Sequence, residues 1–263
     1  MSDAAIIDAH VHVGQPGLFF APETEPRELV ATMDRLGIAY AVGTDHKSLY
    51  EPGGERLARL RDVFEQSEGR LHYLGVFDPR RSAECTSALE HARDWPGFVG
   101  LKIHPSLHRV PADDTAYEQA WRYAAEHDLP ILTHSWSVSD YNAVQYLSTP
   151  ERFEGWVRRF PGVRLVLGHA GGRGAGRSDA VRMANEYANV FLDFAGDIFC
   201  YRLIETLVES VPVDKILFGS DHPWSDPRAH LSQVLLAEIG VSAKTKILGR
   251  NAMRVYRIGT GRC

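Results

Sequence analysis

The sequence predicts an α/β protein with a single domain over residues 1–263, folded as a (β/α)8 barrel of the TIM type. Eight apolar segments of strand length recur about every 30 residues, which is the length of one strand, one crossover helix and two short loops. The segments are almost continuously apolar, as parallel strands buried on both faces usually are. An open doubly wound sheet is the competing architecture, but it usually has fewer strands and a glycine motif at its switch point.

The expected elements follow from two periodicities. The strands are expected, in order, at Ile6–Val13, Ile38–Thr44, Leu71–Phe77, Phe98–His104, Pro130–His134, Val163–His169, Val190–Phe194 and Lys215–Asp221. Apolar residues at helical spacing, such as Leu29, Met33 and Leu36, mark the helices between them. These are expected at Pro26–Leu36, Glu55–Phe64, Thr115–Glu126, Glu151–Phe160, Arg228–Glu238 and Lys244–Tyr256. Gly37 and Gly162 stand between helix and strand, where a left-handed C-cap is expected.

A glycine-rich segment, Gly172–Gly176, matches no phosphate-binding motif. It has the pattern G-x-G-x-G, which differs from both the dinucleotide fingerprint and the P-loop. We therefore expect a flexible loop there.

Composition excludes several classes of protein. The net charge of −5 gives no basic surplus for nucleic-acid binding, and no apolar run is long enough to cross a membrane. The first residues do not resemble a signal peptide, so we expect a cytoplasmic protein. Cys85, Cys200 and Cys263 are far apart and form neither a disulfide framework nor a thiolate zinc site.

Five of the expected strands end in an imidazole or a carboxylate, and these residues are the main functional signal. They are His10 and His12, His104, His134, His169 and Asp221. Active sites of such barrels lie at the carboxyl ends of the strands. Imidazoles and a carboxylate on rigid strand ends are the ligands that zinc and similar divalent metals prefer.

The strand pleat adds a prediction about direction. Residues two apart point the same way, so His10 and His12 should both face the barrel interior. Ile7, Ala9 and Val11 should then face the helices. By the same rule Lys102 and His104 share one face of their strand.

These motifs together resemble the amidohydrolase superfamily. The resemblance is closest to the branch often called amidohydrolase 2, which contains aminocarboxymuconate-semialdehyde decarboxylase. It spans nearly the whole chain, in order, through Asp8-x-His10-x-His12, Gly100–Leu–Lys–Ile–His–Pro105, His134, Leu167–Gly–His–Ala–Gly–Gly172, Leu217–Phe–Gly–Ser–Asp–His–Pro223 and Gly249–Arg–Asn–Ala–Met–Arg254.

The resemblance implies a distorted (β/α)8 barrel and a metal held by His10, His12, His134 and Asp221. We expect one zinc ion per chain, with manganese or a binuclear site as alternatives. Such a metal lowers the pKa of bound water to about 7, and Asp221 would take the water proton as well as bind the metal. His169 corresponds to the family's acid–base residue.

Lys102 has three readings. Binuclear members of the superfamily carry a carboxylated lysine at this place, bridging two metals, with strand 5 and strand 6 histidines on the second, so that His134 and His169 would both serve the second metal. Alternatively its amine faces the substrate or forms a salt bridge, or its role is purely structural. Asp8 could fix a ligand imidazole or pair with Lys102, and we expect Asp193 to be a structural hydrogen-bond acceptor.

The loops after the strands should form the substrate pocket, with His104, Trp136 and Arg173 as substrate-binding candidates. Two long loops also carry aromatic residues that could instead cover a dimer interface. These are Phe19 and Phe20 in the first loop, and Trp136, Tyr141 and Tyr146 in the loop after the fifth strand.

Two enzymatic functions share this ligand set. One is a metal-dependent hydrolase of a small amide, lactone or ester, and the other is a non-oxidative decarboxylase of an aromatic or unsaturated acid. The short chain lacks long insertions, which favours the hydrolase. A binding protein without catalysis would not need a complete ligand set. The expected partner is a small-molecule substrate, with a homodimer as an option, and neither nucleic acid nor membrane.

Overall fold

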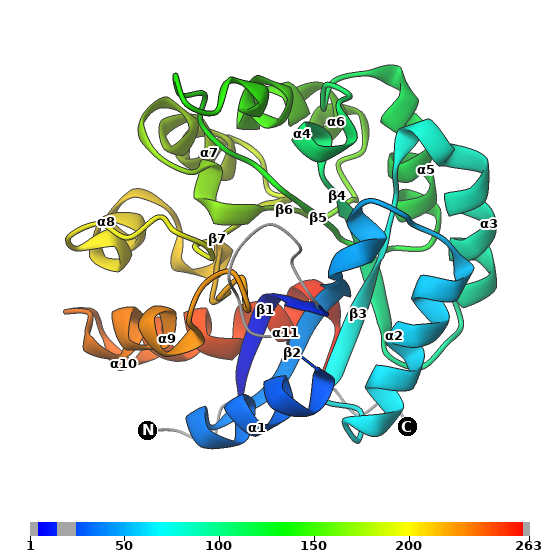
Figure 1. Ribbon diagram of the computed structural model, residues 1–263. Coiled ribbons are helices and arrows are strands. Elements are labelled where there is room, and N and C mark those ends of the chain that lie inside the picture. Colours follow the sequence, from blue (N-terminus) through cyan, green and yellow to red (C-terminus); the bar gives the residue numbers. More distant parts are fainter. Residues whose placement is uncertain (1–4, 15–24, 260–263) are drawn as a thin grey trace.

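The computed structural model describes residues 5–14 and 25–259. Eight parallel strands form one sheet in sequential order, and the helices lie outside them (Figure 1). The strands are β1 Ile6–Val13, β2 Ile38–Asp45, β3 Leu71–Val76, β4 Phe98–Ile103, β5 Ile131–Thr133, β6 Leu165–Leu167, β7 Val190–Asp193 and β8 Ile216–Leu217. The predicted (β/α)8 barrel is confirmed.

The barrel closes between its first and last strands. Val11 forms a parallel bridge with His222, and the Ala9 amide donates to the Phe218 carbonyl at 2.9 Å. The Asp221 amide donates to the His10 carbonyl at 2.7 Å. Closure therefore brings the histidines of β1 next to the aspartate that follows β8.

The helices include all six expected segments, in whole or in part. They are α1 Pro26–Leu36, α2 Gly54–Gln66, α3 Ser82–Ala92, α4 Pro105–His108, α5 Glu118–Glu126, α6 Glu154–Arg159, α7 Gly174–Glu186, α8 Leu203–Ser210, α9 Pro227–Leu236, α10 Val241–Thr245 and α11 Asn251–Tyr256. The sequence patterns did not indicate α3, α4, α7 and α8. No helix among the described residues is both long and apolar enough to cross a lipid bilayer.

The two glycine caps behave differently. Gly37 ends α1 with φ 68°, as expected for a left-handed C-cap. Gly162 does not take a positive φ, so that expectation is wrong. Helix α6 has already ended at Arg159, and Phe160 leaves the helix with φ −124° before the chain reaches the glycine.

The glycine-rich segment is not a loop throughout, because α7 begins at Gly174. A side chain at Gly176 would place its Cβ only 2.2 Å from the Gly171 carbonyl oxygen. The glycine therefore permits a close approach between the first turn of α7 and the turn after β6.

Two clusters of buried apolar residues pack on the two sides of the strands. Part of the prediction of which side chains of β1 face the helices is wrong. One cluster lies between strands and helices and contains Val11, as expected. The other contains one residue from most strands together with part of α11, and it includes Ile7 and Ala9. These two were expected to face the helices. The pairing of β1 with β2 shifts register between Asp8 and Val11, and such a bulge reverses the alternation of side chains.

Candidate metal centre

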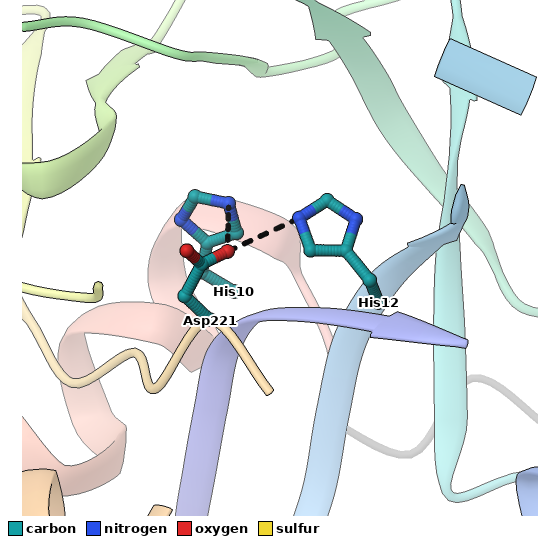
Figure 2. A group of neighbouring side chains, drawn as sticks. All are labelled: His10, His12 and Asp221. Carbon is teal, nitrogen blue, oxygen red and sulfur yellow. Dashed lines mark ion pairs between the residues drawn. The ribbon is translucent and has the colours of Figure 1, made fainter. Parts of the chain in front are cut away.

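Three side chains converge at the closure of the barrel. His10 and His12 lie on β1, and Asp221 lies just after β8 in a left-handed conformation with φ 63° (Figure 2). One Asp221 oxygen is 3.2 Å from Nε2 of His12 and 3.6 Å from Nε2 of His10. Their donor atoms all lie within 4.8 Å of one another, so these residues fit a divalent cation by both chemistry and spacing.

The protonation of this group suits a metal. Burial, and then the charge of Lys102, lowers the pKa of His10, and burial lowers that of His12. Burial alone would raise the pKa of Asp221, but the His12 contact and the nearby imidazoles hold it below its usual range. Neutral imidazoles beside an ionised carboxylate are the protonation states in which these side chains bind metals.

In both His10 and His12, the ring nitrogen that points away from Asp221, Nδ1, has a hydrogen-bond partner. Nδ1 of His10 is 3.0 Å from the Asp193 carboxylate, and Nδ1 of His12 is 2.7 Å from the Thr44 hydroxyl. An ionised carboxylate can only accept, so His10 carries its proton on Nδ1 and its lone pair on Nε2. Sequence reasoning missed Thr44, although its place near the end of an expected strand was a usable signal.

Asp193 was expected to be a structural hydrogen-bond acceptor, and it accepts more hydrogen bonds than the one from His10. Its second oxygen accepts from the His169 amide at 2.9 Å and from the Ala195 amide at 3.0 Å. The side chain is completely buried at the end of β7. One carboxylate thus joins a metal-ligand candidate, His10, to the turn that carries His169.

His169 is held in one orientation. It has φ 61°, and its Nδ1 donates to the Ala195 carbonyl at 2.9 Å. Nδ1 therefore carries a proton, and Nε2 is the nitrogen left to exchange one. A Cβ at Gly196 would lie 2.7 Å from Nδ1 of His169, so only glycine leaves space for the ring.

His134 lies beside this cluster. Its Nε2 donates to the Gln145 side-chain oxygen at 3.0 Å, which leaves the lone pair on Nδ1. Its ring centre is 4.9 Å from that of His169. Among the described residues, His134 does not join His10, His12 and Asp221 in the group with donor atoms within 4.8 Å.

Lys102 lies against a ligand candidate, and Asp8 takes neither of the two roles considered for it. Nζ of Lys102 is 2.9 Å from Nε2 of His10, and burial lowers the pKa of this amine to about 8. Asp8 neither pairs with Lys102 nor contacts an imidazole ring. It accepts from the amides of Ser220 at 2.9 Å and His10 at 3.3 Å, and burial raises its pKa to about 7. Asp8 therefore ties β1 to the segment after β8.

The substrate-binding candidates divide into two groups. Two of them, His104 and Trp136, form a stack of nearly parallel rings with His134. The His134 ring lies between those of His104, at 4.1 Å, and Trp136, at 6.1 Å between ring centres, with an angle of 7° in each pair. Arg173 lies at the rim, where it pairs with Asp197 at 3.6 Å and is half exposed. The loop residues Tyr141 and Tyr146 are exposed, and Phe19 and Phe20 lie outside the described residues.

Comparisons with known proteins extend over the whole barrel. The family described as "Amidohydrolase" matches residues 7–258. The fold is similar to that of 5-carboxyvanillate decarboxylase LigW from Sphingomonas paucimobilis, with a TM-score of 0.75, 15% identity, and 97% of this chain and 99% of that chain covered. It is also similar to 2,6-dihydroxybenzoate decarboxylase from Rhizobium, with a TM-score of 0.75, 15% identity, and coverage of 97% and 99%.

A third similar structure contains a metal. It is dihydroxybenzoic acid decarboxylase from Polaromonas sp. JS666 with bound manganese and the inhibitor 2-nitroresorcinol. The TM-score is 0.75, the identity is 16%, and 98% of each chain is covered. No curated protein matches the sequence. At these identities the similarity establishes the fold, and the family match establishes the membership.

Proposed function

The chain belongs to the amidohydrolase family, and from that premise we propose that it is a metal-dependent decarboxylase of an aromatic or unsaturated carboxylic acid. One observation carries this proposal. His10, His12 and Asp221 form a group that could hold a metal, in a fold similar to that of several aromatic-acid decarboxylases. This reverses the preference for a hydrolase in the sequence analysis. Because the similarity extends over 99% of the LigW chain, a short chain alone does not separate this protein from such enzymes.

We assign the cation to His10, His12 and Asp221, with His134 as a fourth ligand through Nδ1. A divalent cation is supported by this donor set and by manganese in the similar structures; zinc and manganese are both candidates for its identity. When bound, the cation would draw electron density from a substrate oxygen and so stabilise negative charge during the reaction.

Decarboxylation replaces a carboxylate by a proton on the same carbon. We assign the delivery of that proton to Nε2 of His169, which takes it up from solvent before the step, because Nδ1 is already committed to the Ala195 carbonyl. The proton moves from Nε2 to the carbon, the bond to the carboxylate breaks, its electron pair returns to the ring, and CO2 leaves. His169 then recovers a proton from solvent. The parallel rings of His104, His134 and Trp136 offer a flat wall suited to a planar acid.

The test is CO2 release from a panel of hydroxybenzoic acids by the manganese-loaded protein in water enriched in oxygen-18. We expect CO2 and the decarboxylated arene, with no oxygen-18 in the arene. The double variant His10→Ala/His12→Ala should release none. Incorporation of oxygen-18 into the product of an amide or lactone, without CO2 from any acid, would instead establish the hydrolase. A cytoplasmic location and a small-molecule partner belong to the same proposal.

A further inference from the structure

Lys102 is a buried cation with an unusual partner. Its side chain lies on β4 and is 1% exposed. Among the described residues, no carboxylate oxygen lies within 4.0 Å of its Nζ, so it forms no ion pair there. Its hydrogen bond goes to Nε2 of His10 at 2.9 Å.

That nitrogen cannot serve both Lys102 and a metal. The Nδ1 proton of His10 is held by Asp193, so Nε2 offers one lone pair. When His10 gives this lone pair to a cation, Lys102 loses its acceptor. A buried ammonium group without an acceptor is costly, so the loaded site requires a new acceptor beside Lys102.

The balance of charge indicates what that acceptor is. A divalent cation and Lys102 together supply three positive charges, against two negative charges from Asp193 and Asp221 in contact with the imidazoles. The Asp8 carboxyl, whose pKa burial raises to about 7, lies instead against the backbone amides of Ser220 and His10. The site therefore favours an anion. A carboxylate offers two oxygens, one toward the cation and one toward Lys102.

We propose that Lys102 is an unmodified lysine that binds the carboxylate of the substrate, and that it is freed for this role when the metal takes Nε2 of His10. The proposal rests on the proposed function for the identity of the substrate, but the position of the amine supports it independently. It selects the substrate-facing reading of Lys102 over the carboxylated bridge between two metals.

The experiment compares two probes of equal shape, benzoate and the neutral benzamide, by calorimetry on the manganese-loaded full-length protein. We expect benzoate to bind about tenfold or more tightly than benzamide, as a charge-assisted hydrogen bond would give. Lys102→Met should reduce this preference several-fold, to the part that the cation alone contributes, while one manganese ion per chain is kept. Lys102→Gln, which keeps a donor without the charge, gives a second test if the methionine variant does not fold.

Lys244→Met is the matched control, because Lys244 lies on α10 and donates to the Leu235 carbonyl. It should keep the preference for benzoate. The proposal is overturned if the wild type shows no preference, if Lys102→Met or Lys102→Gln keeps it, or if intact mass shows a carboxylated lysine with two manganese ions per chain. If the benzoate preference depends on Lys102 but no acid releases CO2, the decarboxylase proposal fails and this one stands.

Discussion

At the scale of single residues, the site is organised by the groups behind its ligands. Asp193 orients the His10 ring through Nδ1 and holds the backbone of His169 with its other oxygen. Partners of this kind fix the tautomer of a ligand imidazole and contribute to metal affinity. We therefore expect the same carboxylate to affect both the proposed metal binding and the proposed proton transfer.

Replacing Asp193 should weaken metal binding. In Asp193→Asn the amide nitrogen cannot accept from His10, so we expect manganese affinity to fall by about 10- to 100-fold. Competition with a chromophoric chelator measures this. The control Asp197→Asn removes an exposed carboxylate and should bind manganese like the wild type. Equal affinity in the two variants would contradict the role given to Asp193.

Replacing His169 should separate catalysis from metal binding. His169→Asn removes the proposed proton donor, so we expect the rate of CO2 release to fall by about 10² to 10⁴. Metal content should stay at one ion per chain, because His169 is not assigned as a ligand. Metal analysis alongside the rate assay checks both parts, and a rate within a few-fold of the wild type would remove His169 from the mechanism.

At the scale of elements, the turn after β6 and the segment after β7 are fitted closely to each other. His169 has a positive φ, and so does Gly196, in the segment after β7, with φ 82°. The His169 ring occupies the space in which a side chain at Gly196 would begin. Gly196 has no space for a side chain, and both residues have a positive φ that residues other than glycine rarely adopt. The orientation of His169 therefore depends on two elements that are separate in sequence.

Gly196→Ala tests this dependence. Its Cβ would collide with Nδ1 of His169 and the residue would be strained, so we expect a loss of about 1–3 kcal/mol in unfolding free energy and a marked loss of activity. Gly155→Ala is the matched control, because Gly155 lies in α6 with no atom within 4 Å of its added Cβ. It should leave activity unchanged and raise stability slightly. Urea unfolding and the CO2 assay measure both.

At the scale of the whole molecule, the site joins the first strand to the segment after the last one. A cation held by His10, His12 and Asp221 would link the two ends of the sheet, and only the folded chain brings these three side chains together. Manganese at about 100 times its Kd should therefore stabilise the protein by about 2.7 kcal/mol, a rise in Tm of several degrees. Calorimetry should show no such rise in His10→Ala/His12→Ala.

Stability should also depend on pH through buried histidines outside the site. Burial lowers the pKa of His108 from 6.5 to about 4, and the side chain is fully buried beside Tyr117. Because the unfolded chain takes up the proton first, this contribution is fully present above pH 6.5 and is lost as the pH falls towards 4. The loss is on the order of 3 kcal/mol.

His108→Gln should therefore lose less unfolding free energy than the wild type between pH 7.5 and pH 5. Urea titrations at the two pH values measure the difference. The exposed His91 provides the control, since His91→Gln should keep the wild-type dependence. An unchanged dependence in His108→Gln would show that other groups determine it.

The sequence by itself determined the barrel and the residue types at its mouth. Eight apolar segments about 30 residues apart indicate alternating strands and helices. The placement of His10, His12 and Asp221 at one face follows from that arrangement, because the carboxyl ends of the strands meet there. Local patterns also fixed α1, from its proline at the start to Gly37 at its end.

Only the tertiary structure decided which groups stand behind those residues. Ile7 and Ala9 lie inward of the bulge in β1, and α7 begins within the glycine-rich segment and approaches Gly171 closely. The barrel also brings Asp193 and Lys102 to the two nitrogens of His10. Each of these depends on contacts between residues far apart in the chain. Such contacts leave no periodic signal, because periodicity reports only which face of an element is buried and not what lies against it.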